Sequence, residues 1–328
     1  MTLKKESFFN RFLIELIIIF SKILNLFDFK IRTLFILLNI VVSSFFLMVY
    51  VKPYLDDKFI KEEVSNLAIK EVKSVPEVIV ITTPETLPLK KVSLSTVPSI
   101  AARSFIIYDL KNNKEILQEN KLETLPPASL VKMLSVMFFY QKLDLSKKYN
   151  AVPECNNVEG QKVGYKKGEK VTGKDLLFSS LIFSAGDSIC NMYKITESDL
   201  DGFNNYAKDL GMINSNFTNF IGLDYPGNYT TADDLLKMTL KFIENPLFNE
   251  IVILKSYQME NGKTVYNTNK MLFENNYSIG IKTGTTYGAK ENLIYRYKND
   301  EKDLDILVIL LNSGSRYQDT RNILNQLN

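Results

Sequence analysis

The longest apolar run of the chain sets the strongest limit on how it can fold. Thr33 to Val51 reads TLFILLNIVVSSFFLMVYV, 19 residues without a charge. A helix rises 1.5 Å per residue, so this run would cross about 30 Å, the thickness of the hydrocarbon core of a bilayer. A buried core helix is the alternative, and the length of the run disfavours it. We therefore expect a transmembrane helix over residues 33–51.

The charges before this run indicate its orientation. Residues 1–32 carry six basic side chains against three acidic ones. Lys and Arg are enriched on the cytoplasmic side of membrane proteins, so we expect the N-terminus in the cytoplasm and the chain after Val51 outside. No small-residue cleavage site follows the run, which indicates a single-pass, uncleaved anchor in the cell membrane.

The segment from Phe8 to Phe27 has two interpretations. It is apolar but interrupted by charged and polar residues at near-helical spacing. This pattern favours an amphipathic helix in the membrane interface, so that residues 1–32 form a cytoplasmic and interfacial segment. A second membrane span is the alternative, and it would reverse the predicted topology.

The rest of the chain divides into a linker and a domain. Residues 52–97 are rich in Lys, Glu, Val, Thr and Pro, which predicts an extended extracytoplasmic stalk. Residues 98–328 are expected to form one mixed α/β domain, because 45% of the chain is hydrophobic and 23% is charged. Strands are predicted over Ser104–Asp109, Glu115–Gln118, Ser278–Thr285 and Asp305–Asn312, and helices over Leu130–Leu143, the two halves of Lys174–Tyr193, and Asp233–Glu244.

The chain contains no histidine, which removes several kinds of chemistry. A Ser-His-Asp triad and any zinc site built on imidazole are excluded, and two cysteines cannot form a four-thiolate zinc site. We expect no metal and no organic cofactor. The net charge of +3 is spread along the chain without a basic stripe, so nucleic acid is not an expected partner. A hydrolase on this chain must use Lys, Asp, Glu or Tyr as its base.

The two cysteines, Cys155 and Cys190, are 35 positions apart. A disulfide between them is one interpretation for a domain outside the cell. We favour the other interpretation, which is two small, partly buried thiols.

Ser129 and Lys132 stand at the start of a predicted apolar helix. Residues three apart share a face of a helix, so the hydroxyl and the amine can approach hydrogen-bond distance. Serine is a poor nucleophile on its own, and a neighbouring neutral lysine can act as its base. An ordinary lysine titrates near 10.4, so burial or a second cation has to lower the pKa of Lys132.

Two further stretches carry groups of the same chemistry. Lys282 to Thr285 reads KTGT at a predicted strand edge, where Gly284 would let a ligand backbone lie close and the two threonines offer hydroxyls. The Lys282 cation could depress the pKa of Lys132 and attract a carboxylate. Ser184 lies at the break between two helical runs and could pass a proton to a leaving amine. An exposed strand end and a plain helix-to-helix turn are the alternatives for these two stretches.

In this combination the chain resembles the low-molecular-mass penicillin-binding proteins of the serine D-alanyl-D-alanine carboxypeptidase family. PPASLVKM at residues 126–133 is similar to the nucleophile signature of that family, and Lys282 to Gly284 to its third motif. The resemblance covers residues 98 to 328. Further stretches that agree with it are Ser104–Leu110, Leu210–Met212, Gly222–Asp224, Tyr229–Leu235 and Asn267–Asn269.

The resemblance implies an α+β, β-lactamase/transpeptidase-like fold, with an antiparallel sheet flanked by helices after the N-terminal transmembrane helix. It implies removal of the terminal D-alanine from peptidoglycan stem peptides, with β-lactams as covalent inhibitors. Ser129 would form the acyl-enzyme and Lys132 would be its base. The remaining implied roles are a proton path through Ser184 and Lys282, substrate binding by Thr283, Gly284 and Thr285, and an oxyanion hole from the backbone N–H groups of Ser129 and Thr285.

The chain departs from the family pattern in two places. The second motif of the family reads Ser-x-Asn, and here the third position is Gly186. A glycine cannot make the side-chain contacts to substrate and lysine that an asparagine would make, so turnover would be slow unless Asn191 or a water substitutes. The chain also ends soon after its last predicted strand, so we expect neither the β-rich domain nor the C-terminal anchor of many relatives, and the N-terminal span would replace that anchor.

Two other functions fit the same fold. A β-lactamase needs a deacylation base, usually a glutamate between the second and third motifs, in a Glu-x-x-Leu-Asn context. The candidates for this deacylation base are Glu197, Glu244, Glu250, Glu260 and Glu274, none of which stands in a Glu-x-x-Leu-Asn context. The second alternative is a non-catalytic cell-wall-binding protein, which would explain Gly186.

Overall fold

The structure is a computed structural model that describes residues 93–327. The predicted interfacial segment, transmembrane helix and most of the stalk therefore lie outside the described residues. Among residues 93–327, no helix is long and apolar enough to cross a membrane. The last residues of the predicted stalk pack on the domain, because Leu94 forms a β-bridge with Leu327 and the Ser95 N–H donates to the Gln326 carbonyl at 2.8 Å.

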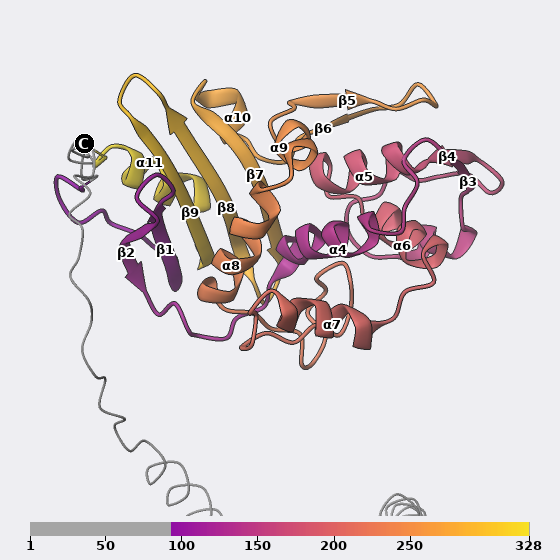
Figure 1. The fold of residues 1–328 in the computed structure, drawn as a ribbon, viewed down its shortest axis with the longest axis horizontal. Coiled ribbons are helices and arrows are strands. Elements are labelled where there is room, and N and C mark those ends of the chain that lie inside the picture. Colours follow the sequence, from indigo (N-terminus) through magenta and orange to yellow (C-terminus); the bar gives the residue numbers. More distant parts are fainter. Residues whose placement is uncertain (1–92, 328) are drawn as a thin grey trace, which may run out of the picture. The chain divides into compact units, whose positions relative to one another are not determined.

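The described part of the chain is built on an antiparallel five-stranded sheet in the order β2-β1-β9-β8-β7 (Figure 1). The predicted antiparallel sheet is thus confirmed. The predicted strands Ser104–Asp109 and Glu115–Gln118 are also present and form a hairpin, since β1 and β2 are adjacent antiparallel strands. The sheet strands are β1 (Ser104–Asp109), β2 (Lys114–Glu119), β7 (Ser278–Thr286), β8 (Lys290–Asn299) and β9 (Leu304–Ser313).

Strand β9 is central to the sheet and is buried along its whole length. Its sequence LDILVILLNS is apolar on both faces, as expected for a strand that is covered on both sides. Alternate residues point to opposite faces. Leu307 and Ile309 belong to a core shared with most of the helices, whereas Ile306 and Val308 belong to a second core that includes Ile323.

Helices cover both faces of the sheet. Helix α11 packs on one face against β8 and β9, and α8 packs on the other against β1 and β9, with the remaining long helices beyond it (Figure 1). Thr172, Thr231 and Asp199 cap the N-termini of three helices with their side-chain oxygens, which fixes where those helices begin. The helices are α4 (Val131–Tyr140), α5 (Gly173–Ile182), α6 (Gly186–Ile195), α7 (Leu200–Asp209), α8 (Ala232–Ile243), α9 (Pro246–Val252), α10 (Met271–Glu274) and α11 (Arg316–Leu324).

Short elements complete the fold. The 3-10 helix η2 (Ala128–Leu130) precedes α4, and a second 3-10 helix, η3 (Pro153–Asn157), follows β3. Two small antiparallel sheets pair β3 (Lys148–Asn150) with β4 (Lys170–Thr172) and β5 (Ser256–Gln258) with β6 (Thr264–Tyr266).

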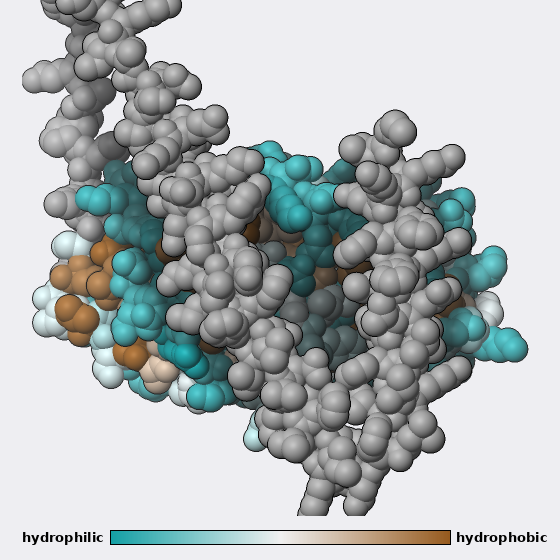
Figure 2. All heavy atoms as spheres, turned by 90° about the horizontal axis from the view of Figure 1, so that it is seen from below, coloured by the Kyte–Doolittle hydropathy of each residue, from teal (hydrophilic) through white to brown (hydrophobic). Residues whose placement is uncertain are grey.

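Hydrophilic side chains cover most of the surface that Figure 2 leaves visible, and apolar side chains gather there in a few patches.

Candidate active site

The segment that carries Ser129 is pressed between two glycines. A Cβ on Gly284 of β7 would lie 3.0 Å from the Ser129 backbone nitrogen, and a Cβ on Gly222 would lie 1.9 Å from the Ala128 carbonyl oxygen. A contact of 1.9 Å is not possible, so position 222 needs glycine, whereas a Cβ at position 284 would push the Ser129 segment away by a few tenths of an ångström. Gly284 therefore brings β7 against the chain's own backbone at Ser129, in addition to the role toward a ligand that was expected. Asn292 of β8 fixes the same segment by donating to the carbonyls of Pro126 and Pro127 at 2.9 and 3.1 Å.

Ser129 and Lys132 are in direct contact. The Lys132 Nζ lies 2.7 Å from the Ser129 Oγ, as predicted from their spacing. The Lys132 side chain is buried at the start of α4, and burial lowers the pKa of its amine from 10.5 to about 7. The carboxylate of Asp187 opposes this shift and raises the pKa. At neutral pH a large fraction of Lys132 is therefore uncharged and able to accept a proton.

A second pair of groups, Ser184 and Lys282, lies beside the first. The Lys282 Nζ donates to the Ser184 Oγ at 2.8 Å and to the Thr283 carbonyl at 2.9 Å. Burial, followed by repulsion from Lys132 and Arg316, lowers the pKa of Lys282 well below its ordinary value. Ser184 sits at the break between α5 and α6 in the left-handed region, with φ of 64°. The predicted break between two helical runs is confirmed.

The hydroxyls of Thr283 and Thr285 on β7 face the same space, and residues outside the KTGT motif hold them in place. The Thr283 and Thr268 hydroxyls are 2.6 Å apart. The Arg316 guanidinium donates to the Thr285 Oγ1 at 2.5 Å and to the Gly284 carbonyl at 2.8 Å. Arg316 was not predicted as a site residue, because it stands alone after the last strand and only the fold brings it to β7.

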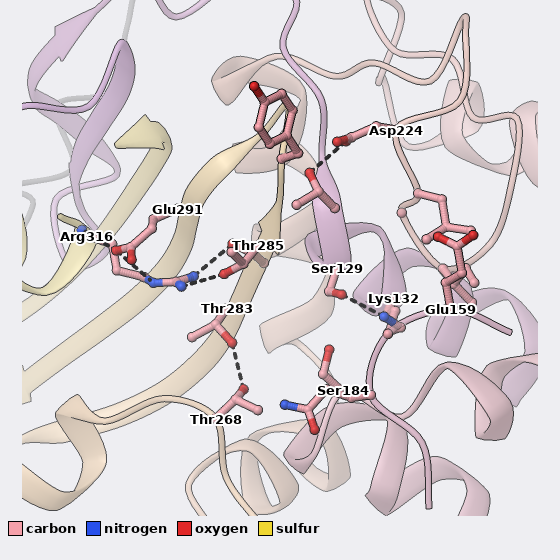
Figure 3. A pocket seen from close by; sticks show the side chains of 18 of the residues that line it. Ser129, Lys132, Glu159, Ser184, Asp224, Thr268, Thr283, Thr285, Glu291 and Arg316 are labelled. Atoms are coloured by element: carbon pink, nitrogen blue, oxygen red, sulfur yellow. Dashed lines mark hydrogen bonds and ion pairs between the residues drawn. The ribbon is translucent and has the colours of Figure 1, made fainter. Parts of the chain in front are cut away.

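These groups line one cavity of about 810 Å³, except Lys282, which contacts the lining through Ser184 and Thr283. Figure 3 shows Ser129 between the β7 threonines on one side and Lys132 and Glu159 on the other, with Ser184 pointing into the space below them. Asp224 holds the rim by accepting from the Thr286 hydroxyl and the Gly288 N–H, both at 2.7 Å. The site residues of the cavity lining are Ser129, Lys132, Ser184, Thr283, Gly284 and Thr285, and the lining also contains Glu159, Gln161, Asp224, Thr268 and Arg316.

Two expectations about the region around α6 are wrong. Cys155 and Cys190 form a disulfide with Cα atoms 5.4 Å apart, whereas free thiols were favoured. The sequence spacing alone could not reveal that η3 lies against α6. Asn191 does not substitute for the missing asparagine of the second motif, because its side chain is buried and already bonded to the Val152 N–H and the Asp187 carbonyl.

The family model of D-alanyl-D-alanine carboxypeptidase matches residues 91–313, which is more than half of the chain. The chain belongs to this family. It is 31% identical over 214 residues to the D-alanyl-D-alanine carboxypeptidase DacC of Escherichia coli, a match that covers 60% of this chain and 53% of DacC. A D-alanyl-D-alanine endopeptidase of E. coli is 27% identical, with 65% of this chain and 72% of that protein covered. The chain spans about half the length of the first curated carboxypeptidases that it matches.

Solved structures share the fold of this carboxypeptidase family member. The D-alanyl-D-alanine carboxypeptidase of Mycobacterium tuberculosis superposes with a TM-score of 0.65 at 22% identity, covering 70% of this chain and 92% of that chain. A penicillin-binding protein of Listeria monocytogenes in its ampicillin-bound form gives a TM-score of 0.62 at 23% identity, covering 69% and 97%. The predicted penicillin-binding, transpeptidase-like fold is thereby confirmed.

Proposed function

We propose that this protein is a serine-type D-Ala-D-Ala carboxypeptidase that removes the terminal D-alanine from peptidoglycan stem peptides through an acyl-enzyme on Ser129. The observation that carries the proposal is the 2.7 Å contact between the Ser129 hydroxyl and the buried amine of Lys132. Burial keeps this amine substantially neutral near pH 7, and a neutral amine in contact with a hydroxyl is the arrangement that general-base activation requires.

In the acylation step, Lys132 takes the proton of Ser129 while the Oγ bonds to the carbonyl carbon of the penultimate D-alanine. The backbone N–H groups of Ser129 and Thr285 stabilise the oxyanion. The C–N bond then breaks, and the Ser184 hydroxyl, hydrogen-bonded to Lys282, passes a proton to the leaving amine. Ser184 recovers its proton at the expense of the one that Lys132 took up, so Lys132 is neutral again. Water then attacks the ester, Lys132 accepts its proton and returns it to the Ser129 Oγ as the ester C–O bond breaks, and the shortened peptide leaves.

Substrate binding is assigned to the edge of β7 and to the cations beside it. Strand β7 is the last strand of its sheet, hydrogen-bonded only to β8, so its other edge can pair with an extended peptide. The hydroxyls of Thr283 and Thr285 and the guanidinium of Arg316 suit the terminal carboxylate of the peptide. Gly284 keeps β7 close to Ser129, so that the peptide bond to be cleaved lies against the nucleophile.

We further propose that residues 33–51 anchor the protein in the cell membrane, with the catalytic domain outside. The Lys/Arg excess of residues 1–32 supports this orientation. The Cys155–Cys190 disulfide is a second, independent support, because disulfides persist mainly in oxidising compartments. Peptidoglycan stem peptides are then the expected substrate, and β-lactams the expected covalent inhibitors.

Covalent labelling with a fluorescent penicillin tests the proposal. The unmodified protein should be labelled at Ser129, and Ser129→Ala should not be labelled while its free energy of unfolding stays within ~1 kcal/mol of the parent. Retained labelling of Ser129→Ala would assign the nucleophile to another residue. Mass spectrometry of a pentapeptide and of a cross-linked peptide then separates carboxypeptidase from endopeptidase activity by the product released.

The same assay separates the two alternative functions. A β-lactamase would release the label rapidly, whereas a peptidase forms a long-lived acyl-enzyme. None of the five glutamates between the second and third motifs lines the described cavity, which disfavours the lactamase. A non-catalytic wall-binding protein would stay unlabelled, and the paired contacts of Lys132 and Lys282 with serine hydroxyls disfavour it.

A further inference from the structure

A loop between β3 and β4 is fastened to α6 beside the cavity. We call residues 152–164 the strap. The Cys155–Cys190 disulfide joins the strap to α6, and the buried carboxylate of Asp187 accepts from two of its backbone N–H groups at 3.1 and 2.8 Å. These tethers hold the strap in one position relative to Ser184, which lies two residues before α6. The two N–H groups that Asp187 binds are those of Val163 and Gly164. A third contact holds the start of the strap, where the Val152 N–H donates to the Asn191 side chain.

The strap fills the place into which a side chain at Gly186 would extend. The Gly186 N–H donates to the Gln161 carbonyl at 2.7 Å. A Cβ on Gly186 would already touch the Glu159 carbonyl oxygen and Val158, each at 3.4 Å. A side chain at this position would therefore pack against the strap. Gly186 is not in the left-handed region, so its backbone conformation does not require glycine. The strap is thus the part of the chain next to the place where the second motif lacks a side chain.

The strap brings its own amide to the cavity. Gln161 lines the cavity together with Ser129, Lys132 and Ser184. Its side chain is exposed, and within residues 93–327 its amide has no recorded hydrogen bond, so both N–H donors are available to a ligand. The hydrogen bond between Gln161 and Gly186 involves backbone atoms only, so it leaves the Gln161 side chain free. A free amide is thus held next to the position where the family motif carries one.

We propose that Gln161 is a substrate-binding residue whose side-chain amide takes the place of the side chain that Gly186 lacks. It donates to the carbonyl of the amide group on the acyl side of the bond that is cleaved. This inference rests on the proposed function, because it assumes that a peptide or β-lactam acylates Ser129. No bond is made or broken at Gln161, and its contribution is the orientation of the bound amide.

Acylation rates of the full chain in detergent test the inference. Gln161→Ala keeps the backbone carbonyl that binds Gly186, so it removes only the side chain. We expect it to lower the second-order rate of acylation by benzylpenicillin at least about tenfold, as for the loss of one ligand hydrogen bond. Gln161→Glu has the same shape but no N–H donors, and it should lose as much. Gln118→Ala, an exposed position on β2, is the matched control and should acylate normally.

A second ligand distinguishes binding from a structural effect. The penicillin nucleus without its acylamino side chain, 6-aminopenicillanic acid, lacks the carbonyl that Gln161 would bind. Its acylation rate should differ by less than about twofold between Gln161→Ala and the parent protein. Equal losses with both compounds, or an unchanged rate with benzylpenicillin, would overturn the inference. If the parent protein is not acylated by either compound, the proposed function itself fails and the inference fails with it.

Discussion

At the residue scale, the site depends on two lysine side chains that are kept out of water. Lys132 is 4% exposed and Lys282 is 1% exposed, and within residues 93–327 neither amine has a carboxylate as a hydrogen-bond partner. Burying an ammonium group without such a partner is unfavourable, so the fold lowers the pKa of both amines. Asp187 moderates the shift at Lys132 from within α6. The cost of burial is therefore what makes a neutral, proton-accepting amine available at neutral pH.

The pH dependence of acylation follows from the pKa of Lys132. The base must be neutral, so the rate should rise with pH, be half-maximal near the pKa of about 7, and reach a plateau above pH 8. Stopped-flow labelling between pH 5 and pH 10 measures this profile. A rate that does not change across that range would show that Lys132 does not titrate as the base.

The same pKa predicts how stability changes with pH. The folded pKa of about 7 lies below the unfolded value of 10.5, so the unfolded chain binds more protons between these two pH values. The free energy of unfolding should therefore rise with pH across this window because of Lys132. Lys132→Met should be inactive and, relative to the parent, most stabilised at and below pH 7. Denaturant unfolding of both proteins at pH 7 and pH 10 measures the difference, which should shrink at pH 10.

Recognition of the terminal carboxylate is assigned to Arg316. Arg316→Leu should lower kcat/KM for a peptide with a free C-terminal carboxylate at least about tenfold, and should change kcat/KM much less for the corresponding carboxamide, which carries no charge to bind. The ratio between the two substrates does not depend on how much protein is folded. Arg103→Leu, an exposed arginine that is paired with Glu123 and lies outside the cavity lining, is the control. An unchanged ratio in Arg316→Leu would assign the carboxylate to other groups.

At the element scale, the position of the nucleophile depends on how closely β7 and the loop at Gly222 approach η2. Gly222 combines a φ of +87° with a Cβ position 1.9 Å from the Ala128 carbonyl oxygen. Gly227 has a similar φ of +81°, but its Cβ would meet only Thr218 at 3.5 Å and Asn216 at 3.8 Å. Comparing the two glycines therefore separates the effect of a left-handed backbone, which both have, from the effect of close packing against η2, which only Gly222 has.

Alanine at these two positions should have different effects. Both substitutions place a side chain in the left-handed region, which costs ~1–2 kcal/mol. Gly222→Ala also forces η2 to move, so it should lose a further ~1–3 kcal/mol and most of the penicillin labelling. Thermal unfolding and labelling of both variants provide the measurement. Equal stability and equal labelling would mean that Gly222 does not set the position of Ser129.

The elements with the strongest periodicity could be predicted from the sequence, and others could not. Strands β1 and β9 are continuous apolar runs, and both were predicted within a residue. Strand β8 was not predicted, because Lys, Glu and Arg interrupt its sequence KENLIYRYKN and only its place between β7 and β9 buries it. The short motifs pointed to Ser129, Lys132 and Lys282. Arg316, Thr268 and the strap were missed as parts of the site, because tertiary contacts alone bring them to it.

At the scale of the whole molecule, the disulfide should contribute strongly to stability. It closes a loop over a sequence separation of 35 and joins the strap to α6. Loop-closure entropy for such a separation corresponds to about 4 kcal/mol. The double variant Cys155→Ala/Cys190→Ala should therefore unfold at clearly lower denaturant concentration. The parent protein under reducing conditions is the matched comparison, and an unchanged midpoint in both would contradict this contribution.

The proposed anchor predicts where the full chain is found in cells. The full chain should sediment with membranes and resist extraction at alkaline pH, whereas a variant that lacks residues 1–51 should not. Protease added to intact spheroplasts should cleave the domain and leave the N-terminal segment protected. Recovery of the full chain in the soluble fraction would contradict the anchor, and protection of the domain would reverse the orientation.

The two outer strands of the sheet differ in what they present to other molecules. Strand β2 carries charged Lys114 and Glu119 and the polar Gln118 at exposed positions, and such side chains discourage a neighbouring chain from adding there. At the opposite end, the β7 residues from Thr283 to Thr286 line the cavity. An extended polypeptide is thus disfavoured from pairing with β2 and, in the proposed function, can pair with β7 only where it fits beside Ser129. The difference between the two edge strands therefore limits aggregation at one edge and selects the orientation of a bound peptide at the other.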